Sequence, residues 1–141
     1  GTGVCGETEP RERSNPGGDP MTPEELKTFQ QLKRLEVQVY RGLHLNAANT
    51  ESDTNRSVID QWIKTHPHSL TNLEKVLNHI HIYDFFLSMQ DEAELERLAN
   101  EIAQSWEKVL SGLDPRYRVE RYEGYGPEVT FYFDRGVPDT G

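Results

Sequence analysis

The spacing of the apolar side chains changes once along this chain, near residue 115. Before that point apolar residues recur at steps of three and four, which is the period of one face of an α-helix. From Tyr117 to Phe133 they alternate with polar residues, as in a half-buried β-strand. The sequence therefore predicts an α+β fold, mainly α, in which four helices are followed by a C-terminal antiparallel β-hairpin packed on the helices.

Capping residues and helix breakers divide the first half of the helical part. The first helix is expected over residues 23–41, between a capping signature at Thr22 and the glycine Gly42, which suits a left-handed C-terminal position. The second helix is expected from a cap at Thr50 to Pro67.

The third helix is expected to begin at a capping box formed by Thr71 and Glu74 and to continue to Leu87. It becomes apolar nearly all round toward its C-terminal end. We therefore expect it to lie at the centre of the core.

The fourth helix is expected from Ser88 or Asp91 to Gly112. Acidic residues gather near its start, where negative charge complements the helix dipole. Its apolar stripe continues for about five turns and comprises Leu95, Leu98, Ile102, Trp106, Val109 and Leu113.

Two strands are expected on either side of the turn-rich stretch 123–127. Alternation directs Val129, Phe131 and Phe133 toward the helices, and it leaves Tyr122 and Tyr132 on the outer face.

Residues 21–136 are expected to form a single globular α+β domain, with a disordered N-terminal tail at 1–20 and a C-terminal tail at 137–141. The first tail has too little apolar surface to offset the entropy lost on ordering. The single cysteine, Cys5, has no partner for an intrachain disulfide, and the N-terminus lacks the pattern of a secretory signal. These features favour a cytoplasmic protein.

The excess of acidic residues limits the classes of partner. The formal net charge is −9, with 24 acidic and 15 basic residues, which disfavours polyanions such as duplex DNA. Three arginines alternate with tyrosines on the first strand, namely Arg116, Arg118 and Arg121. A cross-strand ion pair of Arg118 or Arg121 with Glu128 explains them without a nucleic acid. No apolar run reaches the roughly 18 residues of a membrane-spanning helix, so we expect no membrane binding.

The segment 78–84 carries side chains of the types that bind zinc or non-haem iron. On the expected helix, residues two apart point roughly 200° apart, so His79 and His81 cannot hold one ion. His81 and Asp84, three apart, share a face and are the remaining metal candidates, with a hydrogen bond to a neighbouring element as the alternative. We assign no metal site and no cofactor.

The outward tyrosines favour association. Tyr122, Tyr125 and Tyr132 lie on a hairpin whose edges are open, so we expect them to contact a protein partner or a second copy. An isolated cross-strand pair of Tyr122 and Tyr132 is the alternative.

Known catalytic motifs are absent from the sequence, so no catalytic residue is assigned and an enzyme is the less favoured class. We expect a non-enzymatic protein-interaction module, with a homodimer through the hairpin as one form. The alternative function is that of a small-ligand or metal-dependent enzyme with a pocket near His79, His81 and Asp84.

Overall fold

The computed structural model describes residues 21–66, 69–89 and 91–136, so both expected tails lie outside the described residues. Within these ranges the chain forms four α-helices, which are α1 (Pro23–Lys33), α2 (Asp53–Thr65), α3 (Leu70–Asn78) and α4 (Glu92–Leu113). The strands are β1 (Val37–Tyr40), β2 (Leu43–Asn46), β3 (Ile80–His81), β4 (Tyr117–Gly124) and β5 (Gly126–Phe133). Two short 3-10 helices are η1 (Ala47–Thr50) and η2 (Ile82–Phe85). The α+β class with a C-terminal hairpin on the helices is confirmed.

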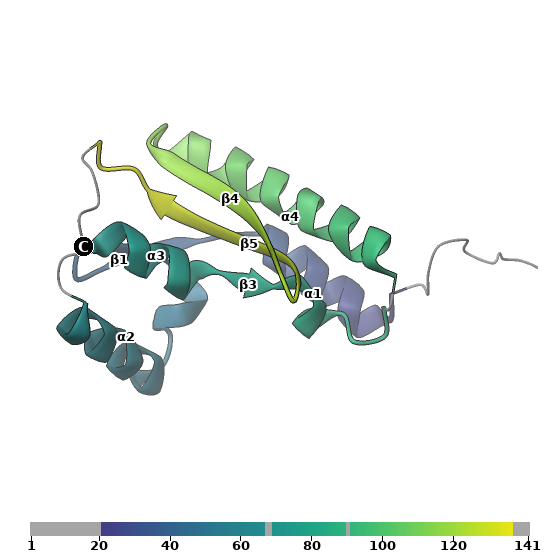
Figure 1. The fold of residues 1–141 in the computed structure, drawn as a ribbon, viewed down its shortest axis with the longest axis horizontal. Helices are drawn as coiled ribbons and strands as arrows, with labels where there is room; N and C mark the ends of the chain where they lie inside the picture. The colour runs from purple at the N-terminus through teal and green to yellow at the C-terminus, as the bar shows by residue number, and fades with distance from the viewer. Residues whose placement is uncertain (1–20, 67–68, 90, 137–141) are drawn as a thin grey trace, which may run out of the picture.

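The described strands form two separate antiparallel sheets. β1 and β2 pair as a hairpin, and β3, β5 and β4 form a three-stranded sheet with β5 at its centre. α4 runs along the β4–β5 hairpin and covers one face of that sheet (Figure 1). α3 packs against β5 from the other side. No helix of the described residues is long and apolar enough to cross a membrane.

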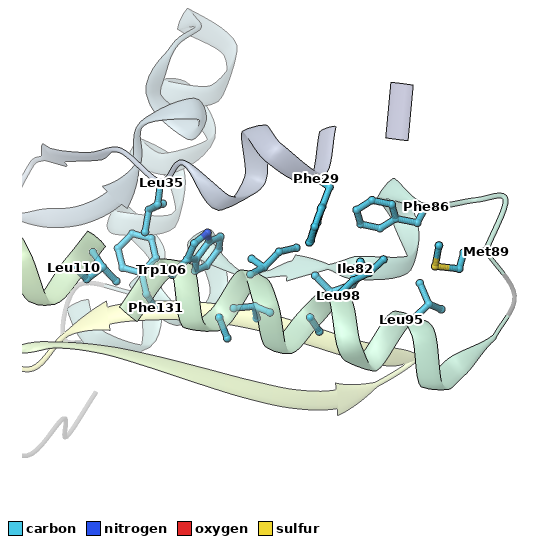
Figure 2. Close-up of a cluster of buried hydrophobic side chains, with 14 residues drawn as sticks. Phe29, Leu35, Ile82, Phe86, Met89, Leu95, Leu98, Trp106, Leu110 and Phe131 are labelled. Carbon is cyan, nitrogen blue, oxygen red and sulfur yellow. The ribbon is translucent and has the colours of Figure 1, made fainter. Parts of the chain in front are cut away.

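The larger apolar cluster lies between α4, α1 and the three-stranded sheet (Figure 2). Trp106 of α4 is fully buried there. Its indole Nε1 donates to the backbone carbonyl of Leu32 at 2.6 Å, and its ring meets Phe131 edge-on with 5.7 Å between centroids. The indole therefore joins α1, α4 and β5. A second cluster joins β2, α2 and α3, and it contains Leu43, Leu45, Ile59 and Leu73.

The expected fourth helix and hairpin are confirmed. The side chain of Asp91 caps α4 by accepting from the backbone N–H of Ala93 at 2.9 Å. β4 pairs with β5 from Tyr117 opposite Phe133 to Gly124 opposite Gly126. On the inner face of β5, Val129 and Phe131 are fully buried, as expected, and Phe133 is half-buried.

The first expected helix is wrong in its C-terminal half. α1 ends at Lys33, and residues 37–46 form the β1–β2 hairpin instead. Arg41 and Gly42 have φ angles of 53° and 83°, the pair of positive values that a two-residue hairpin turn requires. Leu43 and Leu45 alternate along β2 and are fully buried. The four-residue step from Val39 to Leu43, which in the sequence alone is typical of a helix, therefore joins two paired strands.

The third expected helix is also too long. α3 ends at Asn78, and His79 is already extended, with φ −74° and ψ 146°. Ile80 and His81 form β3, which pairs with Val129 and Glu128 of β5. Pairing with a distant strand therefore overrides the local helical period. The second helix begins near its expected start, at a cap from Ser52, and its expected end at Pro67 lies outside the described residues.

Two polar side chains of α3 lie between the two sheets. Glu74 and Asn78 are 0% and 1% exposed. The Glu74 carboxylate accepts from the backbone N–H of His44 in β2 at 2.7 Å and from that of Phe133 in β5 at 2.9 Å. The Asn78 amide accepts from the N–H of Asn46 at 2.8 Å and donates to carbonyls on both strands. Glu74 thus connects β2 and β5 and does not form the expected capping box with Thr71. The N-cap residue of α3 makes no side-chain capping hydrogen bond.

Candidate functional site

The outer face of the three-stranded sheet, turned away from α4, meets α3 at an open hollow of about 350 Å³. The α3 side contributes Asn72, Lys75, Val76 and His79, and the hairpin contributes Tyr122 and Glu128. His79 and the hairpin residues Tyr122 and Glu128, which are distant in the sequence, therefore line one surface feature.

His79, which lines this hollow, meets a second histidine, His81. His79 follows the last residue of α3 and His81 ends β3, so their spacing of two is that of an extended chain. Their Nε2 atoms lie 3.1 Å apart, and their ring planes are 77° apart. The expectation that His79 and His81 point apart is wrong. It assumed that both lie on a helix, but α3 ends at Asn78.

A carboxylate from another element completes the cluster. Glu128 of β5 is opposite His81 in the β3–β5 register, and its Oε2 lies 3.4 Å from the His81 Nδ1. A Cβ at Gly124 would overlap the Glu128 carboxylate, so the carboxylate occupies space that a side chain at 124 would fill. Among the described residues, His79, His81 and Glu128 form the group whose potential ligand atoms all lie within 4.8 Å of one another.

The hydrogen-bond partners of the outer nitrogens determine which ring nitrogens carry lone pairs. The His79 Nδ1 lies 2.6 Å from the carbonyl oxygen of Val76, which only accepts, so this Nδ1 is protonated. The His81 Nδ1 lies 3.4 Å from the Glu128 carboxylate. With its proton on Nε2, His81 donates to the His79 Nε2, whereas with its proton on Nδ1 both Nε2 atoms carry lone pairs that face each other. That arrangement is favourable only when a cation, either a proton or a metal ion, lies between them.

The donor set matches the preferences of a first-row transition metal. Two imidazole nitrogens and one carboxylate suit zinc or ferrous iron. In a tetrahedral zinc site with Zn–N bonds of about 2.0–2.1 Å, two nitrogens lie about 3.3 Å apart, which is close to the 3.1 Å found here. A ligating histidine usually donates its second N–H to a carbonyl or a carboxylate, as His79 does to the carbonyl of Val76.

Asp84 lies away from this cluster. It is an exposed residue of η2 and is not a member of the group formed by the two histidines and Glu128. The expected pairing of His81 with Asp84 required a continuous helix, which the structure replaces with β3 and η2. His81 has Glu128 as its carboxylate neighbour instead.

The expected interface tyrosines have different surroundings. Tyr125 at the hairpin tip is 89% exposed, and Tyr122 is 40% exposed. Both Tyr122 and Tyr132 donate their hydroxyl groups to the carboxylate of Glu120. Burial, together with the hydrogen bond to Glu120, raises the pKa of Tyr122 to about 12. The two tyrosines are therefore linked through a shared acceptor.

The expected ion pairs with Glu128 are wrong. Arg121 donates its Nε to the backbone carbonyl of Glu128, while its guanidinium pairs with Glu96 of α4 at 2.8 Å and with Glu123 at 2.9 Å. Arg118 lies 3.4 Å from the carboxylate of Asp134. The β4–β5 register places Tyr132 opposite Arg118 and Val129 opposite Arg121.

Sequence reasoning missed Glu128 as a member of the cluster. The available signal was the alternation of His79, Ile80, His81 and Ile82, which is the period of a strand and places both histidines on one side. The identity of the facing strand, and so of Glu128, depends on long-range pairing.

Comparison with protein-family models, with curated protein sequences and with solved structures gave no match. The assignment of a function therefore rests on the geometry of the residues themselves.

Proposed function

We propose that this protein binds a divalent transition-metal ion, with zinc as the ion of choice, through the Nε2 atoms of His79 and His81 and the carboxylate of Glu128. The observation that carries the proposal is the 3.1 Å approach of the two Nε2 atoms, with the Glu128 carboxylate in the same group of potential ligand atoms. A cation bound between the two rings turns this contact into a pair of coordinate bonds.

The hollow beside the cluster supports a role in ligand binding. A tetrahedral ion with three protein donors keeps one position for water or a ligand, as catalytic zinc sites do and structural ones do not. His79 and Glu128 both line the hollow, together with Lys75 and Tyr122. We therefore propose that the ion and the hollow together bind a small ligand.

Titration calorimetry with zinc chloride tests the metal site. We expect one zinc per chain for the unaltered protein, and a loss of affinity of at least about tenfold for His79→Ala and for His81→Ala. His66→Gln is the matched control, because His66 is an exposed histidine at the end of α2. Circular dichroism checks that each variant is folded.

Two results would overturn the metal proposal. The first is an absence of zinc binding by the unaltered, folded protein. The second is zinc binding that survives in both His79→Ala and His81→Ala, since the ion then lies elsewhere.

A protein-interaction module is the second candidate function. It is favoured by one observation, namely that β4 lies at an edge of the three-stranded sheet with exposed tyrosines beside it. A cytoplasmic location, suggested by the single cysteine, belongs to the same proposal.

A further inference from the structure

The outer edge of β4 offers backbone groups for pairing. Alternate residues of an antiparallel strand direct their N–H and C=O groups to opposite sides. The N–H of Phe133 donates to Glu74, and the carbonyl of Phe131 accepts from Asn78, so these groups of β5 point away from β4. Val119 is the register partner of Phe131. Its N–H and C=O therefore point away from β5, toward the free edge.

We propose that two copies of this chain pair antiparallel through the outer edges of β4, with the two-fold axis at Val119. The two three-stranded sheets then join into one continuous sheet. Val119 of one copy lies opposite Val119 of the other, and Arg118 lies opposite Glu120 of the second copy. The occupant of the edge is thus a second copy of the same strand.

Charge selects this register. A two-fold axis at Arg118, Glu120 or Arg121 places identical charges opposite each other, which is destabilising. The axis at Val119 instead creates two pairs of opposite charge, because Arg118 and Glu120 flank it symmetrically. The Glu120 carboxylate meets Tyr132 and Lys75 on the sheet face turned away from α4. Arg118 is two positions away on the same strand and so shares that face, where opposed residues are close enough to interact.

An axis at Tyr122 avoids opposed like charges within the strand but crowds acids at the hairpin tip. Glu123 there lies beside Glu96 of α4, and a hydrogen bond with Glu96 together with its negative charge raises the pKa of the Glu123 carboxyl. A second copy would bring another Glu123 and Glu96 to the same place. The Val119 register keeps the two tips apart.

Two further features prepare the edge near Val119. A hollow of about 460 Å³ lies between α4 and β4 and is lined by Lys108, Tyr117 and Val119, among others, so side chains of a second copy have space there. The Glu120 carboxylate is also held in place, since Tyr132 donates to it at 3.0 Å and the Lys75 ammonium lies 3.8 Å away. A fixed acceptor loses little entropy when a second copy's arginine reaches it.

Sedimentation analysis over a range of concentrations tests the pairing. We expect the unaltered chain to dimerise, and Arg118→Glu to weaken the dimer at least about tenfold because it places two carboxylates opposite each other. Arg34→Glu is the matched control, since it changes the net charge equally at an exposed site of α1's C-terminus. A strictly monomeric unaltered chain at high micromolar concentration, or equal dimerisation by Arg118→Glu and Arg34→Glu, would overturn the proposal.

Mixing two variants tests the register itself. Glu120→Lys alone places a lysine opposite Arg118 and should also weaken self-association. An equimolar mixture of Arg118→Glu and Glu120→Lys pairs opposite charges at both positions, so we expect a mixed dimer to form. The absence of a mixed dimer, when the unaltered chain does dimerise, would show that a different surface joins the copies.

Discussion

Arg135 holds the buried carboxylate of Glu74 with two guanidinium nitrogens, at 3.0 Å from Oε1 and 2.5 Å from Oε2. Glu74 has no exposed surface, and the Arg135 side chain is 22% exposed. The same carboxylate accepts two backbone N–H groups, one from each sheet. This pair therefore connects the end of β5 with α3 and the β1–β2 hairpin.

Removal of Arg135 should be costly. Arg135→Ala leaves the Glu74 charge buried without its cation, and we expect a loss of about 3–5 kcal/mol in the free energy of unfolding. Urea denaturation followed by circular dichroism measures it. Arg97→Ala, which breaks exposed ion pairs on α4, should cost less than about 1 kcal/mol. Similar losses for both variants would argue against a special role for the buried pair.

Two glycines should respond oppositely to alanine. Gly42 has a φ of +83° in the β1–β2 turn, whereas Gly112 lies in α4, and no atom within 4 Å obstructs a Cβ at either position. We expect Gly42→Ala to destabilise the fold by about 1 kcal/mol through backbone strain. Gly112→Ala should stabilise it by about 0.4–1 kcal/mol. Denaturation midpoints measure both, and a stabilising Gly42→Ala would contradict the turn geometry.

His44 should make stability depend on pH. Burial lowers its pKa, while nearby Glu74 raises it and Arg135 lowers it, and the net shift is downward. Because the unfolded chain then binds the proton more tightly, His44 costs stability as pH falls from about 6.5. We expect His44→Gln to lose less unfolding free energy than the unaltered protein between pH 7.5 and pH 5.5. An equal loss in both proteins would mean that His44 titrates alike in the folded and unfolded states.

Gly124 should matter for zinc but little for folding. A Cβ at this position meets the Glu128 carboxylate, so Gly124→Ala should displace that carboxylate and weaken zinc binding at least about tenfold. The zinc-dependent rise in melting temperature measures the effect, because a ligand stabilises the state that it binds. Gly112→Ala should keep the full rise. A full rise in Gly124→Ala would remove Glu128 from the proposed donor set.

The sequence predicts those elements whose signal is local. α4 has a cap at Asp91 and a long apolar stripe, and the β4–β5 hairpin has alternation on both sides of a glycine-rich turn. Both depend on residues close together in the chain, and both are confirmed. The turn at Arg41 and Gly42 is equally local, but glycine suits both a hairpin turn and a helix end, so the sequence alone does not distinguish the two.

The candidate site was predicted only in part, because its geometry depends on where α3 ends. The sequence indicates His79 and His81 as ligand types, but their relative direction follows from the pairing of β3 with β5. That pairing joins residues about fifty positions apart, so the periodicity of α3 cannot predict it. The same long-range pairing brings Glu128 to the two histidines.

α3 stands in for a missing strand. Glu74 and Asn78, one helical turn apart, supply donors and acceptors to the edges of β2 and β5 that a neighbouring strand would otherwise provide. Each residue inserted into a helix rotates the rest of that helix by roughly 100° about its axis. A single insertion between Glu74 and Asn78 would therefore rotate one of the two side chains away from β2 and β5. The spacing between these two residues can change by no residue without loss of these hydrogen bonds.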